Sequence, residues 1–479
     1  MLKKITTSLF LLITFASYSQ NEVDALRYSL FDNYSTARVS ALGGSFSSLG
    51  GNIGSVTLNP ATLGVYRTDE FSITFANENE DIQSNYLNQE NTTNRYKLYI
   101  QNLSYVKSMP ILDSDWNRIN FSMNYNRTKD LSRKVNIYGH NNESSMVNSF
   151  LQNSQGLSVD DLNGFSDYLA FWTYLIDTTN VDNEYYSNIT EIGQKQQLSI
   201  DESGSIDEIN FACSGAYKDF LFIGLSLNVT GISFSQHTRY MEDEFNMEIN
   251  DLESFTYDQY LDVVGSGVNF KMGAIIKPLP TLRLGWAYHS KTHHEIEESY
   301  QTEMNTNFIN NESFSGTSDI NYFNYELSTP TKTISSIAIV FAKRGLLTLD
   351  YETIDYSSSN LESYYYSFNQ ENTNINDFYK KTNNTKIGIE WKYNNIAFRS
   401  GYAMYGSPFS NDLNDGSKEY ISGGIGFQKG PYFIDIAMIN SIGKEDYVLY
   451  RDLSIDSPEQ LASLETIENM IMVSCSYKF

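Results

Sequence analysis

The chain has 479 residues, of which 14% are aromatic and only 19% charged, below the roughly 25% charged that is usual for soluble domains. Its formal net charge of −25 argues against nucleic-acid binding, and its two cysteines are too few for a disulfide framework or a structural zinc site. No internal apolar run reaches about 18 residues, and Asn, Ser, Thr, Tyr and Gly are abundant throughout, so neither a membrane-spanning helix nor a helical bundle is expected.

The first 19 residues have the organisation of a secretory signal peptide. Lys3 and Lys4 form a short basic region, residues 5–15 are largely apolar, and Ser17 and Ser19 stand at positions −3 and −1 of a cut before Gln20. An uncleaved anchor helix is the alternative, but the apolar stretch is too short for one. No cysteine stands at the cut, so a lipoprotein is not expected.

Residues 20–66 form a Gly- and Ser-rich segment that is too irregular for membrane strands. A short helix is expected over 22–31, and the pairs Gly43-Gly44 and Gly50-Gly51 permit positive φ and close packing. Asn59-Pro60-Ala61 follows, and Pro60 stops any local helix or ladder. Such a backbone cannot lie bare in lipid, but it can lie inside a barrel, where side chains of the lumen satisfy it. We therefore interpret it as a plug.

From residue 67 onward, the sequence alternates between apolar and polar residues. This alternation is typical of strands, and most of the segments are about 9–11 residues long or slightly longer, the length that a tilted strand needs to cross a bilayer. About fourteen such strands are predicted, at 69–77, 96–107, 118–126, 208–217, 220–234, 267–277, 281–291, 333–342, 346–355, 385–393, 396–405, 420–428, 432–440 and 470–479.

The connections between these segments alternate in length. Short ones occur at 218–219, 278–280, 343–345, 394–395 and 429–431, with a slightly longer one at 108–117. Long ones are predicted at 78–95, 127–207, 235–266, 292–332, 356–384, 406–419 and 441–469. This alternation is typical of periplasmic turns and extracellular loops. The predicted fold is therefore all-β: a transmembrane antiparallel β-barrel of about 14 strands with an N-terminal hatch, or plug, inside the lumen.

Alternation also assigns the two faces of each strand. Ile387, Ile389, Trp391 and Tyr393 are expected to face lipid, as are Cys213 and Cys475, which lie on strands that are not neighbours and should not bridge. Charges are tolerated only on the lumen side. The predicted lumen charges are Lys271, Arg283, Asp350, Glu352, Lys386, Glu390, Arg399 and Asp435, for which mutual pairing without a transport role remains an alternative.

The longest connection contains an apolar and aromatic run at roughly helical spacing, from Phe165 to Ile176. It is either a lid or groove that receives an apolar ligand, or a short helix that packs the loop onto its neighbours. The candidate ligand-contacting residues are Phe165, Tyr168, Phe171, Trp172 and Leu175.

The sequence "Ala-Arg-x-x-Ala-Leu-Gly-Gly-Ser-Phe-Ser-Ser-Leu-Gly-Gly", followed by Asn59-Pro60-Ala61, resembles the N-terminal hatch of the FadL-type long-chain fatty-acid transporter family. Thr62 stands where that family usually has Gly. The strand count agrees with the family's barrel, and the terminal Phe479 resembles the ending of proteins inserted by the outer-membrane assembly machinery. The implied organisation is a signal peptide at 1–19, a hatch at 20–66 and a barrel at 67–479.

The resemblance implies uptake of hydrophobic small molecules, such as long-chain fatty acids or similar lipids. Loops would capture the ligand, the hatch would then move, and release would be lateral or periplasmic. The gating residues of the hatch would be Gly43, Gly44, Gly50, Gly51, Asn59, Pro60 and Ala61. The family's lateral exit lies at a kink in the third strand, yet residues 118–126 contain no Gly or Pro to mark one.

Two other functions stay open. Some barrels of this broad family serve as docking platforms for secreted proteins, and a general porin would leave a continuous aqueous path, which the hatch argues against. No motif for a nucleophile elbow or phosphate loop occurs, and His289, His293 and His294 lie where a strand enters a loop, so no enzyme, cofactor or metal site is expected. We expect a monomer in the outer membrane of a Gram-negative bacterium, in contact with outer-membrane lipid and lipopolysaccharide.

Overall fold

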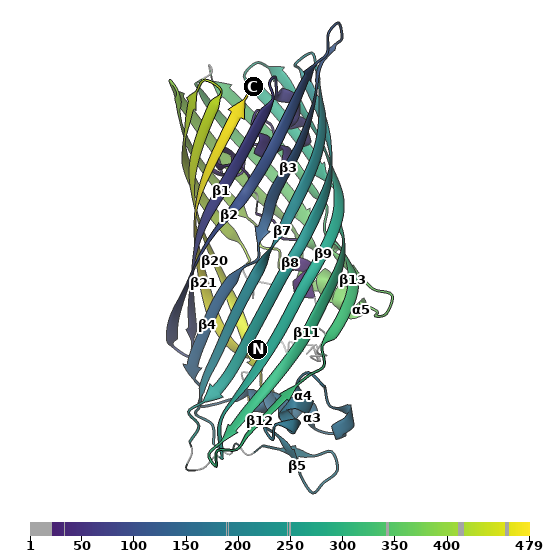
Figure 1. The fold of residues 1–479 in the computed structure, drawn as a ribbon, viewed down its shortest axis with the longest axis vertical. Coiled ribbons are helices and arrows are strands. Elements are labelled where there is room, and N and C mark those ends of the chain that lie inside the picture. The colour runs from purple at the N-terminus through teal and green to yellow at the C-terminus, as the bar shows by residue number, and fades with distance from the viewer. Residues whose placement is uncertain are drawn as a thin grey trace, which may run out of the picture.

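The alternating segments form the wall of a tall barrel (Figure 1). The computed structural model describes residues 22–32, 34–187, 189, 191–246, 248, 251–341, 344–410, 416–455 and 459–479. The predicted signal peptide and Gln20 lie outside these residues. Among the described residues, no helix is both long and apolar enough to cross a membrane.

Fourteen strands pair antiparallel around the wall, which confirms the predicted number. The strand β1 pairs with β21, from Glu70 opposite Lys478 to Asn85 opposite Ser463, so the sheet closes on itself and neither its first nor its last strand is a free edge. In order around the wall, the strands are β1 (Glu70–Tyr86), β2 (Gln89–Pro110), β3 (Trp116–Asp130), β7 (Lys195–Tyr217), β8 (Leu221–Asp243), β9 (Leu252–Leu279), β10 (Leu282–His289), β14 (Lys332–Phe341), β15 (Gly345–Asp355), β17 (Lys381–Tyr393), β18 (Ile396–Tyr405), β19 (Lys418–Lys429), β20 (Tyr432–Arg451) and β21 (Glu459–Lys478).

Large apolar side chains point outward along the part of the wall nearest the short turns. Leu225, Ile389 and Met438 are 58%, 52% and 63% exposed, whereas the residues beside them in the chain point inward. We call this zone the lipid belt, because such side chains face hydrocarbon in a membrane barrel. Cys213 and Cys475 are exposed and unbridged. Short turns lie on the periplasmic side of such barrels, so the opposite end is extracellular.

The wall continues as sheet well beyond the lipid belt, and here the predicted loop boundaries are wrong. The connection predicted at 78–95 is a two-residue turn at Leu87 and Asn88, between strands that run on to it. Much of 127–207, 235–266 and 292–332 is likewise strand, because polar alternation in water pairs as well as apolar alternation in lipid. The additional strands are β4 (Arg133–His140), β11 (His293–Phe308), β12 (Ser313–Thr317), β13 (Asn321–Ser328) and β16 (Asn360–Glu362), with a separate pair β5 (Asp177–Thr178) and β6 (Tyr185–Tyr186).

Short helices close the extracellular end and one side of the barrel. The helices α3 (Met146–Ser154), η3 (Val159–Asp161) and α4 (Asp167–Trp172) lie at the end opposite the C-terminus (Figure 1). The helices η4 (Tyr356–Ser358) and α5 (Asn369–Phe378) lie in the connection between β15 and β17.

The N-terminal segment lies inside the wall (Figure 1). It contains α1 (Glu22–Arg27), which is shorter than predicted, α2 (Ala37–Ser40), η1 (Ile53–Thr57) and η2 (Pro60–Val65). The helix α2 contacts β19, β20 and β21, and η2 contacts β3, β7, β8 and β9, so the segment spans the lumen from one arc of the wall to another. Most of residues 37–64 are fully buried.

The lipid belt generates a stability prediction. Replacing Leu225 by Arg places a charge on the hydrocarbon-facing side of β8 and should cost about 2–4 kcal/mol of unfolding free energy. Reversible denaturant unfolding in lipid vesicles measures it. Ser233→Arg, on the same face of β8 but in its polar extracellular part, is the matched control and should change stability by less than about 1 kcal/mol. Equal costs at both positions would contradict the assigned belt.

Candidate functional site

Arg38 ties the N-terminal segment to the barrel wall through a network of ion pairs. Its guanidinium donates to both carboxylate oxygens of Glu390, with distances of 2.9 Å from Nε and 2.8 Å from Nη2. Arg399 donates to the same carboxylate at 2.6 Å and to Asp435 at 2.7 Å. Three of the predicted lumen charges therefore surround one residue of the segment. The two-pronged contact sets the orientation of Arg38 as well as its position.

Asp350 holds the turn that follows the first glycine pair. Its carboxylate accepts hydrogen bonds from Ser45 Oγ at 3.0 Å, Phe46 N at 3.2 Å and Ser47 N at 3.0 Å. The turn before it uses Gly43 and Gly44, whose φ angles are +65° and +74°, and the second pair has φ angles of +68° and +76°. A carboxylate buried in the lumen is thus satisfied by backbone and hydroxyl groups of the N-terminal segment.

Three donors of the wall hold carbonyl groups in the second half of the segment. They are Arg283, which donates to Leu49 O, Lys271, which donates to Thr57 O at 3.3 Å, and His289, whose Nε2 lies 2.8 Å from Leu58 O. Lys271 also pairs with Glu208 at 2.5 Å. These carbonyl groups accept no hydrogen bond within a regular helix or sheet, so side chains of the wall donate one to each of them.

Asn59-Pro60-Ala61 forms the start of η2. The Asn59 side chain accepts from Ala61 N at 3.0 Å, which caps the helix, and its amide donates to Ser47 O at 2.8 Å. Pro60 stands at the first helical position, where its missing N–H costs nothing. Thr62, which replaces the usual Gly, donates from Oγ1 to Asn59 O at 2.7 Å, so the substitution closes the same turn.

The remaining two predicted lumen charges, Glu352 and Lys386, pair with each other near a small polar cavity. Glu352 accepts from Lys386 at 3.1 Å and lies 3.5 Å from Lys332, so two ammonium groups share one carboxylate. Lys332 lines a cavity of about 70 Å³, together with His289, Lys271 and the hatch residue Leu58. The cavity is also lined by Glu208 and Asp32, so cationic and anionic side chains both face it.

A large apolar cluster fills the middle of the lumen, and α1 lies within it. Ala25, Leu26 and Tyr28 of the N-terminal segment pack there against side chains of the wall, and Arg27 lies over the ring of Phe234 at 4.6 Å. We call this group of residues the central apolar cluster; it also includes Leu131, Ile206, Ile232, Val263, Ile296, Tyr325, Leu327, Ile354, Tyr356, Leu361, Phe368, Ile375 and Tyr379. The apolar interior of the barrel is thus filled by part of the chain itself.

The backbone ladder of the wall is interrupted between the second and third barrel strands. The strand β2 pairs with β3 only over Asn102–Pro110, while residues 89–100 pair with β1 alone and Gln101 lies at a β-bulge. The strand β3 ends at Asp130, and β4 continues at Arg133 along β7. We call the unpaired stretch, between residues 89–101 of β2 and residues 127–140, the lateral window.

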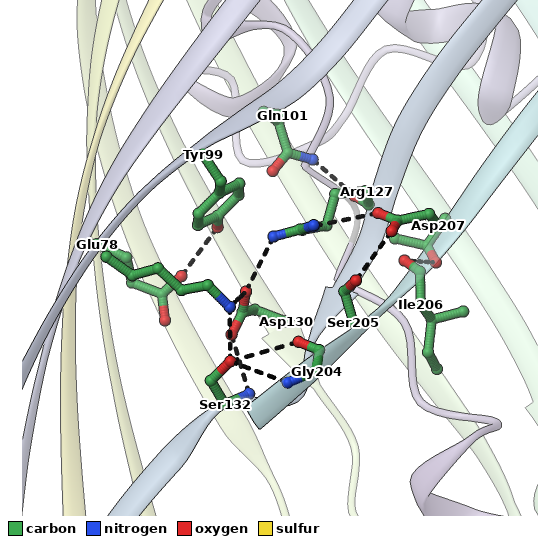
Figure 2. A network of polar contacts seen from close by, with 12 residues as sticks. Glu78, Tyr99, Gln101, Arg127, Asp130, Ser132, Gly204, Ser205, Ile206 and Asp207 are labelled. Carbon is green, nitrogen blue, oxygen red and sulfur yellow. Dashed lines mark hydrogen bonds and ion pairs between the residues drawn. The ribbon is translucent and has the colours of Figure 1, made fainter. Parts of the chain in front are cut away.

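Side chains bridge the lateral window in place of backbone bonds. Gln101, which lies at a β-bulge, donates to Arg127 O at 2.7 Å, and Figure 2 shows this contact beside the Arg127–Asp207 pair. Lys97 of β2 reaches Asp130 at 2.6 Å and Ser132 Oγ at 2.5 Å. We call Lys97, Gln101, Asp130 and Ser132 the window latch. Because each bridge is made by a side chain, rotamer changes can open it without unfolding a strand.

Residues 118–126, the predicted third strand, contain no direct sign of this window. The interruption lies farther along, at Leu131 and Ser132, beyond the predicted third strand. The neighbouring β7 carries the signal instead: Gly204 has φ +151°, accepts from Leu131 N at 3.1 Å and donates to Ser132 Oγ at 3.2 Å. Arg38 and the latch residues were also missed, because nothing in the local sequence around a polar residue identifies a partner that lies far away in the chain.

The predicted ligand-contacting loop lies at the extracellular tip, in the connection between β4 and β7. We call residues 141–187 of this connection the cap. Leu175 is buried in the apolar core of this cap, whereas Trp172 is 57% exposed and its ring stacks on Tyr168. Phe165 contacts Tyr300, and Phe171 contacts Tyr185. The five residues therefore do not line one shared groove: some pack the loop onto its neighbours and others face solvent.

Buried acceptors fasten this cap to the barrel. Glu242 of β8 accepts from Ser145 Oγ at 2.6 Å and Met146 N at 2.8 Å, at the beginning of α3, and burial raises the pKa of its carboxyl. Asp452 accepts from Ser144, Asn148 and Gln152. The cap is thereby held closed over the extracellular end.

Comparison with solved structures identifies the fold. A Pseudomonas aeruginosa FadL homologue matches with a TM-score of 0.58 and 12% identity, over 93% of this chain and 98% of that one. The P. putida toluene transporter TodX matches with a TM-score of 0.55 and 14% identity, over 94% and 99%. The Ralstonia pickettii toluene transporter TbuX matches with a TM-score of 0.51 and 16% identity, over 93% of this chain and 98% of that one.

The chain therefore has the fold of a FadL-type outer-membrane barrel, which confirms the predicted resemblance at the level of the fold. No family model and no curated protein matches the sequence.

The buried carboxyl of Asp167, at the start of α4, generates a pH prediction for the cap. Burial raises its pKa to about 6, above its usual value near 4, so the folded cap binds more protons than the unfolded one between these values. Cap stability should therefore fall as pH rises from about 4 to 6, by up to ~3 kcal/mol. Asp167→Asn removes this dependence.

Limited proteolysis of the cap at pH 5 and pH 7.5, normalised to an unstructured peptide, measures the effect. The native protein should be cleaved faster at pH 7.5, and Asp167→Asn should be equally resistant at both. Asp160→Asn, an exposed carboxyl of the same cap, is the control and should behave like the native protein. A persistent pH difference in Asp167→Asn would contradict the assignment.

Proposed function

We propose that this chain takes up hydrophobic small molecules across the outer membrane of a Gram-negative bacterium. Long-chain fatty acids or similar lipids are the proposed class. Residues 22–66 act as the hatch, the extracellular cap captures the ligand, and release follows hatch movement. The observation that carries the proposal is the combination of a blocked lumen with an interruption of the wall at the lateral window.

The central apolar cluster supports an apolar ligand. It buries Leu26 of α1 and the following Tyr28 among wall side chains, so the interior already accommodates an apolar segment of this size. Each buried side chain of this kind contributes about 1.5–3 kcal/mol, which an apolar ligand can replace when α1 moves. A general porin would have no reason to keep such a cluster in its lumen.

The ammonium group of Lys332 at the small cavity is the proposed partner of an anionic head on the ligand. Lys332 and Lys386 share Glu352, and Lys332 lines the cavity below the apolar cluster. A ligand with an apolar tail and one carboxylate matches both zones. An ion pair between the ligand carboxylate and the ammonium group of Lys332 would supply the polar part of the binding energy.

The lateral window supports release into the membrane. An apolar molecule gains nothing by crossing the aqueous periplasm, and the interrupted ladder requires only side-chain motion to open.

The exposed Phe479 that follows β21 suits recognition by the outer-membrane assembly machinery.

Identification of the bound ligand tests the proposal. The protein is purified in a mild non-acyl detergent, and co-eluting molecules are analysed by mass spectrometry beside a variant lacking residues 43–60. A discrete apolar ligand that is lost in the variant is expected. A protein that carries no lipid but co-purifies with a secreted polypeptide would remove the transport proposal and favour a docking platform.

A reversible cross-link across the lateral window tests the release route. Lys97→Cys and Asp130→Cys, in a background with Cys213→Ala and Cys475→Ala, are joined by a reducible bis-thiosulfonate linker. We expect uptake of labelled fatty acid to fall at least tenfold on linking and to return on reduction, because the latch residues can no longer separate.

The matched control places the same linker across an uninterrupted ladder. Lys444 and Glu465 form an ion pair at 3.2 Å between β20 and β21, in direct register, so their double cysteine variant should keep native uptake when linked. Unchanged uptake in the linked window variant would assign release to the periplasmic side.

A further inference from the structure

The inner wall of the barrel carries two pairs of glycines in direct cross-strand register. Gly224 of β8 lies opposite Gly273 of β9, and Gly388 of β17 lies opposite Gly401 of β18. None of the four has a positive φ, so the backbone itself would accept alanine. Glycine inside a strand weakens it and often marks the close approach of another backbone. The segment that packs closely against each pair therefore explains why these four positions are glycine.

The first pair lies against Asn59 and Pro60. A Cβ added at Gly273 would lie 2.8 Å from Asn59 Cγ and closer still to its Oδ1. One added at Gly224 would lie 2.5 Å from Ala61 N and closer still to the carbonyl group of Pro60. The row continues with small residues on both sides, since Ser214 pairs with Gly224 and Ala287 pairs with Gly273. Together they form a bare trough across four strands.

The second pair lies against Leu42 and Gly43. A Cβ added at Gly388 would lie 2.7 Å from Leu42 O, and one at Gly401 would overlap Gly43 N. The next residue in this row, Ser422, pairs with Gly401 and accepts a hydrogen bond from Gly43 N at 3.1 Å. The turn at Gly43 and the Asn59-Pro60-Ala61 motif thus both meet wall positions that have no side chain.

We propose that these two glycine pairs are seats that set how deeply the hatch sits and thereby seal the lumen against water. The inference rests on the proposed hatch role of residues 22–66, but it assigns the seal to wall residues that the transport reaction itself does not use. Flexible partners such as Arg38 and Glu390 can follow a small displacement of the hatch. Backbone packed on backbone cannot, because no side chain rotates to make room.

Solute leakage through the reconstituted full-length protein tests the seats. Gly224→Ala and Gly273→Ala, and separately Gly388→Ala and Gly401→Ala, should raise sugar permeation in liposome swelling at least tenfold. Gly231→Ala is the matched control in β8, because a Cβ there meets open space, and it should stay within twofold of the native protein. Heat-modifiable migration in gels verifies that each barrel has assembled. The proposal would be overturned if the seat variants form assembled barrels that remain impermeable to sugar.

A second-site variant separates the seat from general damage to the wall. Asn59→Ser shortens the side chain that meets Gly273 while keeping a hydroxyl that can cap η2. Combined with Gly273→Ala, it should lower the leak at least fivefold, and it should not affect the leak of Gly401→Ala. An equal leak with and without Asn59→Ser would overturn the seat. If Gly273→Ala does not assemble, a labelling assay replaces it: Ser48→Cys is labelled with an impermeant maleimide in the Gly224→Ala background. We expect this labelling to be faster than in the Gly231→Ala background. Equal labelling rates would overturn the proposal.

The leakage assay stands apart from the transport assay because its solute is a sugar. A protein that leaks in the seat variants but carries no lipid would retain the seats and lose the proposed ligand. A protein that transports lipid while its seat variants stay sealed would retain the transport proposal and lose the seats.

Discussion

A backbone N–H or C=O that meets hydrocarbon must find its hydrogen bond within the protein, and the rest of this structure depends on that requirement. It explains why β1 returns to pair with β21 and why the sheet has no edge inside the lipid belt. The lateral window is the informative exception. There, the amide of Gln101 and the ammonium group of Lys97 reach across the unpaired stretch, so side chains that can rotate replace a ladder that cannot.

The same requirement makes the lumen the polar compartment of the molecule. An irregular, glycine-rich segment brings many backbone groups without regular partners, and it can fold only where side chains provide them. Asp350, Arg283, Lys271 and His289 do this from several strands. The charges of the wall and the irregularity of the hatch are therefore complementary, and neither would be stable without the other.

The success of sequence reasoning followed the strength of the alternating pattern. Fourteen strands, the lipid-facing row of Ile387, Ile389 and Trp391, and the exposed, unbridged Cys213 and Cys475 were all predictable, because lipid on one face imposes period two. The loop boundaries failed, because beyond the belt both faces meet water and the apolar signal ends while the ladder continues. The break after Asp130 was missed because its mark, Gly204, lies on the neighbouring strand, 73 positions farther along the chain than Leu131.

The sequence by itself determined the class of fold, the faces of the strands and the special turns at Gly43-Gly44 and Asn59-Pro60, since each of these is a local property of the chain. Only the tertiary structure decided that Arg38 meets Glu390, that α1 lies in the central apolar cluster and that Gly43 and Asn59 meet glycines of the wall. Those contacts join residues hundreds of positions apart. The closure and stagger of the barrel set which residues share a height in the lumen, and no local pattern encodes that height.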